Sequence, residues 1–222
     1  MNAIANSSQL GLIVAGLCVA AAVLLVVGFI VDRIATARRS AELFAAVNDS
    51  AWGTPVASHA PGTRGFVATV EPAPEPFRRF EVSHEAGPVY NPLAWLFPTT
   101  TPRREYLFFF ANLPEPPTQE LAWARRRTPP AALSRAPDHT LWTLHHQDVI
   151  DGEYTTRGDN PNGVSHVFVE LQTRFGPQME QVTVYRDDAY HVRLMVRSAA
   201  LNGPDVPKLV GLVRAMGRAA RF

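Results

Sequence analysis

The sequence predicts an α+β protein, with an N-terminal transmembrane helix followed by a mainly antiparallel β-sheet domain that is covered by a C-terminal amphipathic helix. Three patterns support this fold class: an uncharged apolar run near the N-terminus, short alternating segments separated by prolines, and an apolar stripe at helical spacing near the C-terminus. With 222 residues, of which 46% are hydrophobic, the chain can bury the core of one domain. We expect five parts: a tail (1–9), a transmembrane helix (10–31), a helical stalk (32–47), a Pro/Gly-rich linker with one possible strand (48–76) and the α+β domain (77–222).

Residues 10–31 form an apolar run without a charged side chain. At a rise of about 1.5 Å per residue, this run is long enough to cross a hydrocarbon layer roughly 30 Å thick. A buried core helix would be shorter and would carry a polar stripe. A cleaved signal peptide is the closer alternative, because Ala35-Thr36-Ala37 resembles a small-x-small cleavage site. Three features favour a transmembrane helix that is not cleaved: the run is long, no basic residue precedes it, and Arg33 follows it.

The charges that flank the span predict its orientation. Residues 1–9 contain no Lys or Arg, whereas Arg33, Arg38 and Arg39 follow the span at once. The positive-inside rule therefore places the N-terminus outside and the C-terminal domain in the cytoplasm. These arginines also form a basic collar at the membrane interface, which is more typical of topology charges than of specific lipid recognition. Apolar residues continue at near-helical spacing to residue 47, so the span should extend as a helical stalk.

The composition excludes several kinds of chemistry. The net charge is +1, with 21 basic and 20 acidic side chains, so we expect no nucleic-acid partner. Lys208 is the only lysine, which removes Walker-type phosphate loops and makes Schiff-base catalysis improbable. Cys18 is the only cysteine and lies in the apolar run, so no internal disulfide or cysteine zinc cluster can form. Gly-x-Ser-x-Gly and glycine-rich dinucleotide motifs are absent, and we expect no cofactor.

The middle and the last third of the chain predict strands. Nineteen prolines, most of them before residue 138, disfavour long helices in the middle. In the segment 164–175, Val167, Val169, Leu171 and Phe175 alternate, which we interpret as one face of a strand. An antiparallel meander with one wet face fits these patterns. The strand candidates are 65–70, 77–83, 104–113, 119–127, 139–148, 164–175, a strand containing residues 182–184, and 190–197.

A helix should follow the last strand. Asn202-Gly203-Pro204 breaks the strand, Asp205 is the expected N-cap, and Pro207 falls in the first turn. The basic residues of this segment lie off its apolar side, where they suit the helix dipole better than a membrane-surface role. We expect the apolar stripe to cover the sheet; its members are Val206, Leu209, Val210, Val213, Met216 and Ala220.

Residues 144–154 combine two adjacent histidines with three carboxylates. In a strand His145 and His146 point to opposite faces, so they cannot chelate one metal together. Asp151-Gly152 is typical of a hairpin turn, and a hairpin is the favoured interpretation of this segment. A catalytic zinc site needs about three protein ligands, and no HExxH motif supplies them. We therefore predict no metal site and retain as weak candidates His146, Asp148, His166 and His191.

Two apolar segments point to binding. Trp95, Leu96 and Phe97 form an aromatic loop bracketed by prolines, which would either plug its own domain or dock on a membrane neighbour. The segment Phe108–Phe110 is apolar on both strand faces, which favours a central core strand with a layer over each face, supplied either by this chain or by a partner.

These observations favour a non-catalytic binding or assembly subunit of a membrane protein complex. Its partners would be the lipid bilayer and other membrane protein subunits. One alternative is a membrane-tethered metal-dependent or acid/base enzyme that uses His146 and Asp148. Another is a ligand- or lipid-sensing module with a pocket near Trp95. No motif is specific enough to name a family.

Overall fold

A computed structural model of the chain describes residues 2–48, 53–62, 64–87, 105–125, 142–146 and 153–222, with side chains except at residues 2–10 and 146. In chain order the elements are α1 (Asn2–Asn48), β1 (Thr54–Gly62), β2 (Gly65–Glu71), β3 (Arg79–Ala86), β4 (Glu105–Asn112), β5 (Glu120–Ala124), β6 (Thr143–His146), β7 (Glu153–Arg157), α3 (Asn162–Phe175), β8 (Met179–Val184), β9 (Val192–Arg197), the 3-10 helix η3 (Ser198–Ala200) and α4 (Asp205–Ala219).

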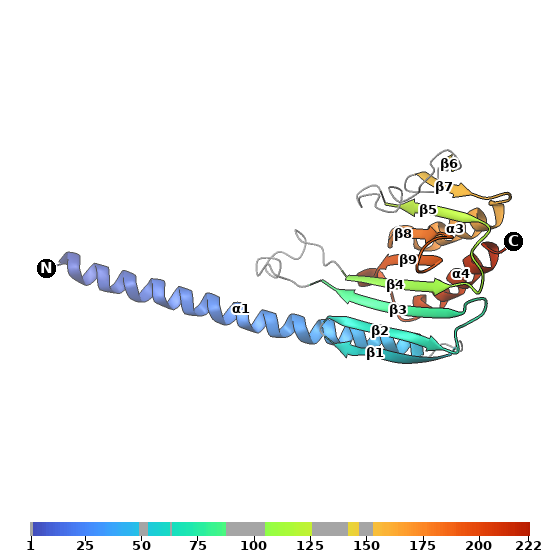
Figure 1. Cartoon of the computed structure of the whole chain (residues 1–222). Coiled ribbons are helices and arrows are strands. Elements are labelled where there is room, and N and C mark those ends of the chain that lie inside the picture. The colour runs from blue at the N-terminus through green and yellow to red at the C-terminus, as the bar shows by residue number, and fades with distance from the viewer. Residues whose placement is uncertain (1, 49–52, 63, 88–104, 126–141, 147–152) are drawn as a thin grey trace.

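The nine strands form one sheet in the order β1-β2-β3-β4-β9-β8-β5-β7-β6. Every neighbouring pair in it is antiparallel. The C-terminal part of α1 packs against β1, β2 and β3, whereas α4 contacts β9 and α3 contacts β5 (Figure 1). The predicted α+β class and the antiparallel sheet are confirmed.

The sheet has one buried face and one partly exposed face. Along β4, Leu107 and Phe109 are completely buried, and they pair with Val196 and Leu194 of β9 in the centre of the sheet. The alternate residues Tyr106, Phe108 and Phe110 point to the other face and are only partly buried. Among the described residues, helices cover one face of β4, and the expected second layer, from this chain or from a partner, stays a prediction. An antiparallel sheet tolerates this arrangement, because its second face can meet water.

The strand predicted over 164–175 is wrong, because this segment is the helix α3. Its buried apolar side chains are Val164, Phe168, Leu171 and Phe175, which are three or four residues apart. That spacing is typical of one face of a helix. The same segment also has apolar residues at every second position, Val167, Val169 and Leu171, which is typical of a strand. Packing decided between them: the Phe168 ring lies 5.8 Å from the ring of Trp123 in β5, centroid to centroid.

The segment expected to be a linker with one possible strand contains two strands, β1 and β2, which form one edge of the sheet. Gly65, at the start of β2, has φ of +110°, and a Cβ there would lie 1.7 Å from the carbonyl oxygen of His84. Only glycine allows this close approach of β2 to β3. Pro55 and Pro61 in the edge strand β1 discourage pairing with another chain. At the opposite edge of the sheet, β6 pairs with β7.

α1 is a single helix of 47 residues. Its N-terminal half is long and apolar enough to span a membrane. The predicted stalk is helical, but it also belongs to the domain core. Thr36, Ser40, Leu43 and Val47, three or four residues apart, are buried. The adjacent Phe44 places its ring edge-on to that of Phe66 in β2, with centroids 5.3 Å apart.

The C-terminal helix α4 has the predicted apolar stripe, and every member of it is buried. The predicted N-cap is off by one residue. Pro204 occupies that position, and Asp205 is the first helical residue. The Asp205 carboxylate instead accepts a hydrogen bond from the backbone N–H of Asn202 at 3.0 Å, which closes the turn before the helix.

Two glycines of α4 differ in how closely the rest of the protein packs against them. A Cβ on Gly217 would lie 2.4 Å from the ring of Phe77, which is itself buried and stacked on Phe80, whereas a Cβ on Gly211 would meet nothing within 4 Å. We expect Gly217→Ala to lower the free energy of unfolding by about 1 to 3 kcal/mol through overpacking. Gly211→Ala should raise it by about 0.5 to 1 kcal/mol, because alanine favours the helix. Thermal unfolding of the two variants measures both effects, and equal shifts would contradict the packing of α4 on Phe77.

Candidate functional site

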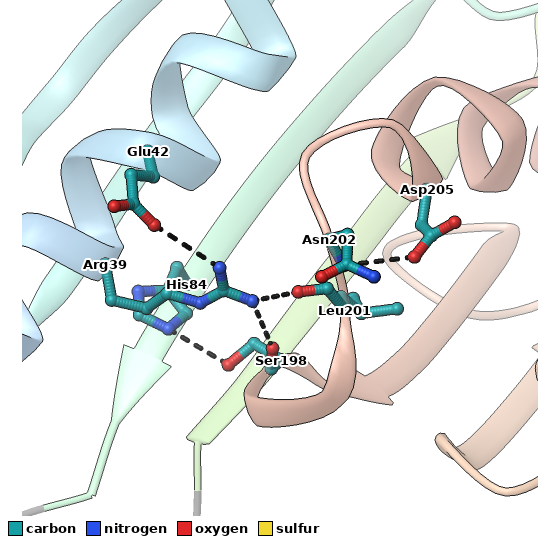
Figure 2. Close-up of polar contacts among 7 residues, drawn as sticks. All are labelled: Arg39, Glu42, His84, Ser198, Leu201, Asn202 and Asp205. Carbon is teal, nitrogen blue, oxygen red and sulfur yellow. Dashed lines mark hydrogen bonds and ion pairs between the residues drawn. The ribbon is translucent and has the colours of Figure 1, made fainter.

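The end of α1 is tied to the segment between β9 and α4 by Arg39. Its Nη2 donates hydrogen bonds to the carbonyl oxygen of Ser198, at 2.8 Å, and to that of Leu201 (Figure 2). Its Nη1 lies 3.4 Å from the Glu42 carboxylate, one turn further along α1. The carbonyl oxygen of Ser198 also accepts the backbone N–H of Leu201 at 3.1 Å, and the guanidinium adds a charged donor to each of the two carbonyl groups. We call Arg39, His84, Ser198 and Leu201 the α1 joint.

His84 and Ser198 form the buried part of this joint. His84 Nε2 and Ser198 Oγ are 3.1 Å apart, and the relative exposure of the two residues is 1% and 0%. Nδ1 of His84 has no hydrogen-bond partner in the structure. Burial, and then the positive charge of Arg39, lower the pKa of His84 to about 4, so the imidazole is neutral at neutral pH.

A histidine within reach of a serine hydroxyl is also the arrangement of an activated nucleophile. Here the hydroxyl is closed off from solvent, so no substrate atom can approach it, and a histidine with so low a pKa is a weak base at neutral pH. The pair of His84 and Ser198 therefore acts as a polar contact that joins β3 to η3.

The three arginines predicted at the membrane interface divide into two groups. Arg33 and Arg38 are exposed, and the guanidinium of Arg33 lies 5.6 Å from the ring centroid of Phe29. Arg39 points into the domain and belongs to the α1 joint. Sequence spacing did not separate Arg38 from Arg39, because the direction of a side chain depends on how the helix packs.

The weak metal-ligand candidates are not brought together by the described residues. His146 lies in β6, with its side chain outside the described residues, and Asp148 lies outside them entirely. His166 is exposed on α3, and His191 precedes β9, where its Nδ1 accepts the N–H of Leu113 at 3.1 Å. Across the ranges that the structure describes, no group of three or more His, Cys, Asp or Glu side chains could hold a metal ion.

The antiparallel pairing of the hairpin predicted around residues 144–154 is confirmed, since β6 pairs with β7, whereas its predicted turn at Asp151-Gly152 lies outside the described residues. His145 stacks on the ring of its cross-strand neighbour Tyr154, with centroids 4.7 Å apart. Its Nε2 lies 2.7 Å from the hydroxyl of Thr156. These contacts give His145 a structural role in the hairpin.

Four partly exposed aromatic side chains line up on the uncovered face of the sheet. The ring centroids of Tyr106 and Phe108 are 6.2 Å apart, those of Phe108 and Phe110 are 5.7 Å apart with parallel rings, and those of Phe110 and Tyr190 are 5.0 Å apart. We call these four residues the aromatic row. The guanidinium of Arg79 lies over the Tyr190 ring, 5.5 Å from its centroid.

Trp95, Leu96 and Phe97, the predicted partner-binding residues, lie outside the described residues. The sequence favoured a central core strand for Phe108 and Phe110, whereas both side chains are only partly buried. The available signal was the aromatic residue at every second position from Tyr106 to Phe110, which puts three rings on one strand face.

No protein-family model matches the chain, and no curated protein matches it either.

Loss of the Arg39 contacts should loosen the α1 joint. We expect Arg39→Ala to lower the free energy of unfolding by about 2 kcal/mol, because two backbone carbonyls lose a charged donor. Arg38→Ala is the matched control, since the Arg38 side chain is exposed, and it should change stability by less than about 0.5 kcal/mol. Chemical denaturation in detergent, together with hydrogen exchange of residues 198–201, measures the effect. Equal behaviour of the two variants would exclude the joint as a stabilising contact.

The low pKa of His84 makes stability depend on pH. The pKa is 6.5 in the unfolded chain and about 4 in the fold, so the unfolded state binds the proton first as the pH falls. The contribution of His84 is complete above pH 6.5 and is lost as the pH falls toward 4. Its full size is on the order of 3 kcal/mol, since one pKa unit corresponds to about 1.4 kcal/mol. We measure the free energy of unfolding at several pH values between 4 and 6.5. It should change less with pH in His84→Gln than in the wild type, and an equal pH dependence in the two proteins would refute this.

Proposed function

We propose that this protein is a single-pass membrane-anchored binding or assembly subunit of a membrane protein complex, and that it is non-catalytic. The observation that carries the proposal is the aromatic row on the uncovered face of a sheet whose other face is packed against the membrane-anchoring helix. The partners are the lipid bilayer and another membrane protein subunit.

The anchor is supported by the surface of α1. Its large apolar side chains from Leu12 to Val31 have relative exposures of 45% to 74%. A continuous apolar cylinder of this length is unstable in water and matches the thickness of a bilayer. Arg33 and Arg38 follow it, while no basic residue precedes it, which supports an outside N-terminus and a cytoplasmic domain. Protease digestion of intact and opened cells separates this orientation from the opposite one.

The composition of the aromatic row supports a protein partner. Tyrosine, phenylalanine and arginine are enriched in protein interfaces, where large rings supply contact area at a low entropic cost. The row is continuous from Tyr106 to Tyr190, and Arg79 and Arg193 place their guanidinium groups 5.5 and 5.9 Å from the centroid of its last ring. Such a centre of rings with charged groups at its edge resembles the apolar core and polar rim of an interface.

The position of the row supports a partner in the same membrane. The helix α1 enters the domain core without a break, and β4 lies in the same sheet that receives it (Figure 1). The row therefore keeps a set distance from the bilayer, and a neighbouring membrane subunit is the protein that meets it most readily. Tethering of both proteins in one membrane raises their effective concentration, so a small contact suffices.

Two measurements test the proposal: a site-specific crosslink from the aromatic row, and recovery of the partner with a variant of the row and a matched control variant. A photoreactive residue at position 108 should crosslink to one membrane protein in native membranes, and Phe108→Asp should reduce recovery of that protein by at least about 10-fold, since a carboxylate would be desolvated in the contact. The matched control is Leu144→Asp, which adds the same charge at an exposed apolar residue of β6. It should leave recovery unchanged, and both variants should unfold at the wild-type temperature.

Three results would contradict the proposal. The protein could be recovered from native membranes as a monomer without any copurifying chain. The two Asp variants could reduce recovery equally. The crosslink at position 108 could join two copies of this chain, which would assign the aromatic row to self-association.

A further inference from the structure

The strands β2 and β4 end, and β3 begins, at the end of the sheet that lies away from the apolar half of α1 (Figure 1). Residues at this end line a pocket. Its volume is about 720 Å³, within the range of roughly 300 to 1,000 Å³ that is common for small-molecule sites. Val70, Ala73 and Leu113 give it an apolar wall. The residues of the α1 joint are not part of its described lining.

Two side chains of opposite charge in the lining are unpaired. Arg78 and Glu71 make no side-chain hydrogen bond or ion pair with any residue that the structure describes. The backbone N–H of Arg78 donates to the carbonyl oxygen of Asn112 at 2.7 Å, which fixes the start of its side chain. The other two charged groups of the lining are satisfied elsewhere: Arg79 pairs with Glu81 at 3.1 Å, and Asp188 pairs with Arg193.

His191 adds a neutral donor to the lining. Its Nδ1 accepts a hydrogen bond from the N–H of Leu113 at 3.1 Å, and its own backbone N–H donates to the side-chain oxygen of Asn112 at 3.2 Å. Burial lowers the pKa of His191, although the nearby Asp188 carboxylate opposes this, so the ring is neutral at neutral pH. A neutral ring that accepts at Nδ1 carries its proton at Nε2. The Nε2–H group has no partner among the described residues and can donate to a ligand.

We propose that this pocket binds a small zwitterion of the free amino-acid class, with the ligand carboxylate at Arg78 and His191 and the ligand ammonium at Glu71. The guanidinium and Nε2–H are donors suited to a carboxylate, and the glutamate is an acceptor suited to an ammonium group. An apolar ligand side chain would lie against Val70, Ala73 and Leu113. A simple anion would be repelled by Glu71, and a simple cation would be repelled by Arg78. A zwitterion pairs an opposite charge with each of the two residues. The proposal goes beyond the proposed function, because its ligand-binding residues Arg78, Glu71 and His191 lie outside the aromatic row, although Arg79 adjoins both regions.

The experiment is calorimetric titration of the full-length protein in detergent with the individual free α-amino acids. For whichever amino acid binds, the deaminated acid and the decarboxylated amine of the same side chain are titrated next. We expect at least one amino acid to bind with a Kd below about 10 mM, and each of the two truncated analogues to bind at least about 10-fold more weakly.

Matched variants test the two charged residues. Arg78→Gln and Glu71→Gln should each raise the Kd of the amino acid at least about 10-fold, and Glu71→Gln should leave the affinity for the deaminated acid unchanged or improved. The controls are Arg218→Gln, an exposed arginine on α4, and Glu85→Gln, an exposed glutamate at the opposite end of β3; neither should change the Kd. Absence of binding by every amino acid would overturn the proposal. So would equal effects of the Arg78 and Arg218 variants, or an analogue that binds as well as the zwitterion.

Discussion

The architecture depends on the packing of the last four turns of α1 against the sheet. Leu43 and Val47 bury apolar surface on β1 and β2, and burial of this kind contributes about 25 cal/mol for each square ångström removed from water. Arg39 adds charge-assisted hydrogen bonds to the carbonyl groups of Ser198 and Leu201, on either side of η3. One helix therefore belongs to two environments, with an apolar half that suits a bilayer and a polar-edged half that completes a domain core. This contact sets the direction of the apolar half of α1 relative to the sheet.

The two faces of the sheet have separate roles. One face holds the core beneath α1, α3 and α4, while the other holds the aromatic row. The proposed ligand pocket lies at the edge of the second face, and Arg79 belongs to both regions, since it lines the pocket and covers the ring of Tyr190. A ligand and a protein partner would thus meet neighbouring side chains. The antiparallel sheet permits this division, because its outer face does not need a covering layer.

The strong preference for arginine over lysine has a structural use. Arg39 is one of several arginines whose guanidinium groups bind backbone carbonyls from distant parts of the chain. Arg125 donates from Nε to the carbonyl oxygen of Met179 at 3.0 Å, and Arg214 donates from Nε to that of Glu75 at 2.7 Å. The planar guanidinium carries five donors in a fixed arrangement, whereas a lysine ammonium is a single point of charge. These arginines connect loops and helix ends that the sheet does not hold.

The sequence by itself determined the apolar helix at the N-terminus, most strands of an antiparallel sheet, and the covering stripe of α4, because each depends on a local pattern that packing did not overrule. Only the tertiary structure decided that 164–175 is helical, since Val164, Phe168, Leu171 and Phe175 fit a helix while other residues of the segment fit a strand. The α1 joint was equally beyond the sequence. Arg39 lies next to Arg38 in the chain and carries the same charge, but Ser198 and Leu201, which distinguish it, lie about 160 residues away, as the separations of 159 and 162 show. The alternating aromatic residues of β4 are a local pattern, but the place of Tyr190 beside Phe110 is not. The pocket likewise joins residues of β2, β3 and β4 with the segment before β9, and such neighbours are set by the order of strands in the sheet, which no local pattern encodes.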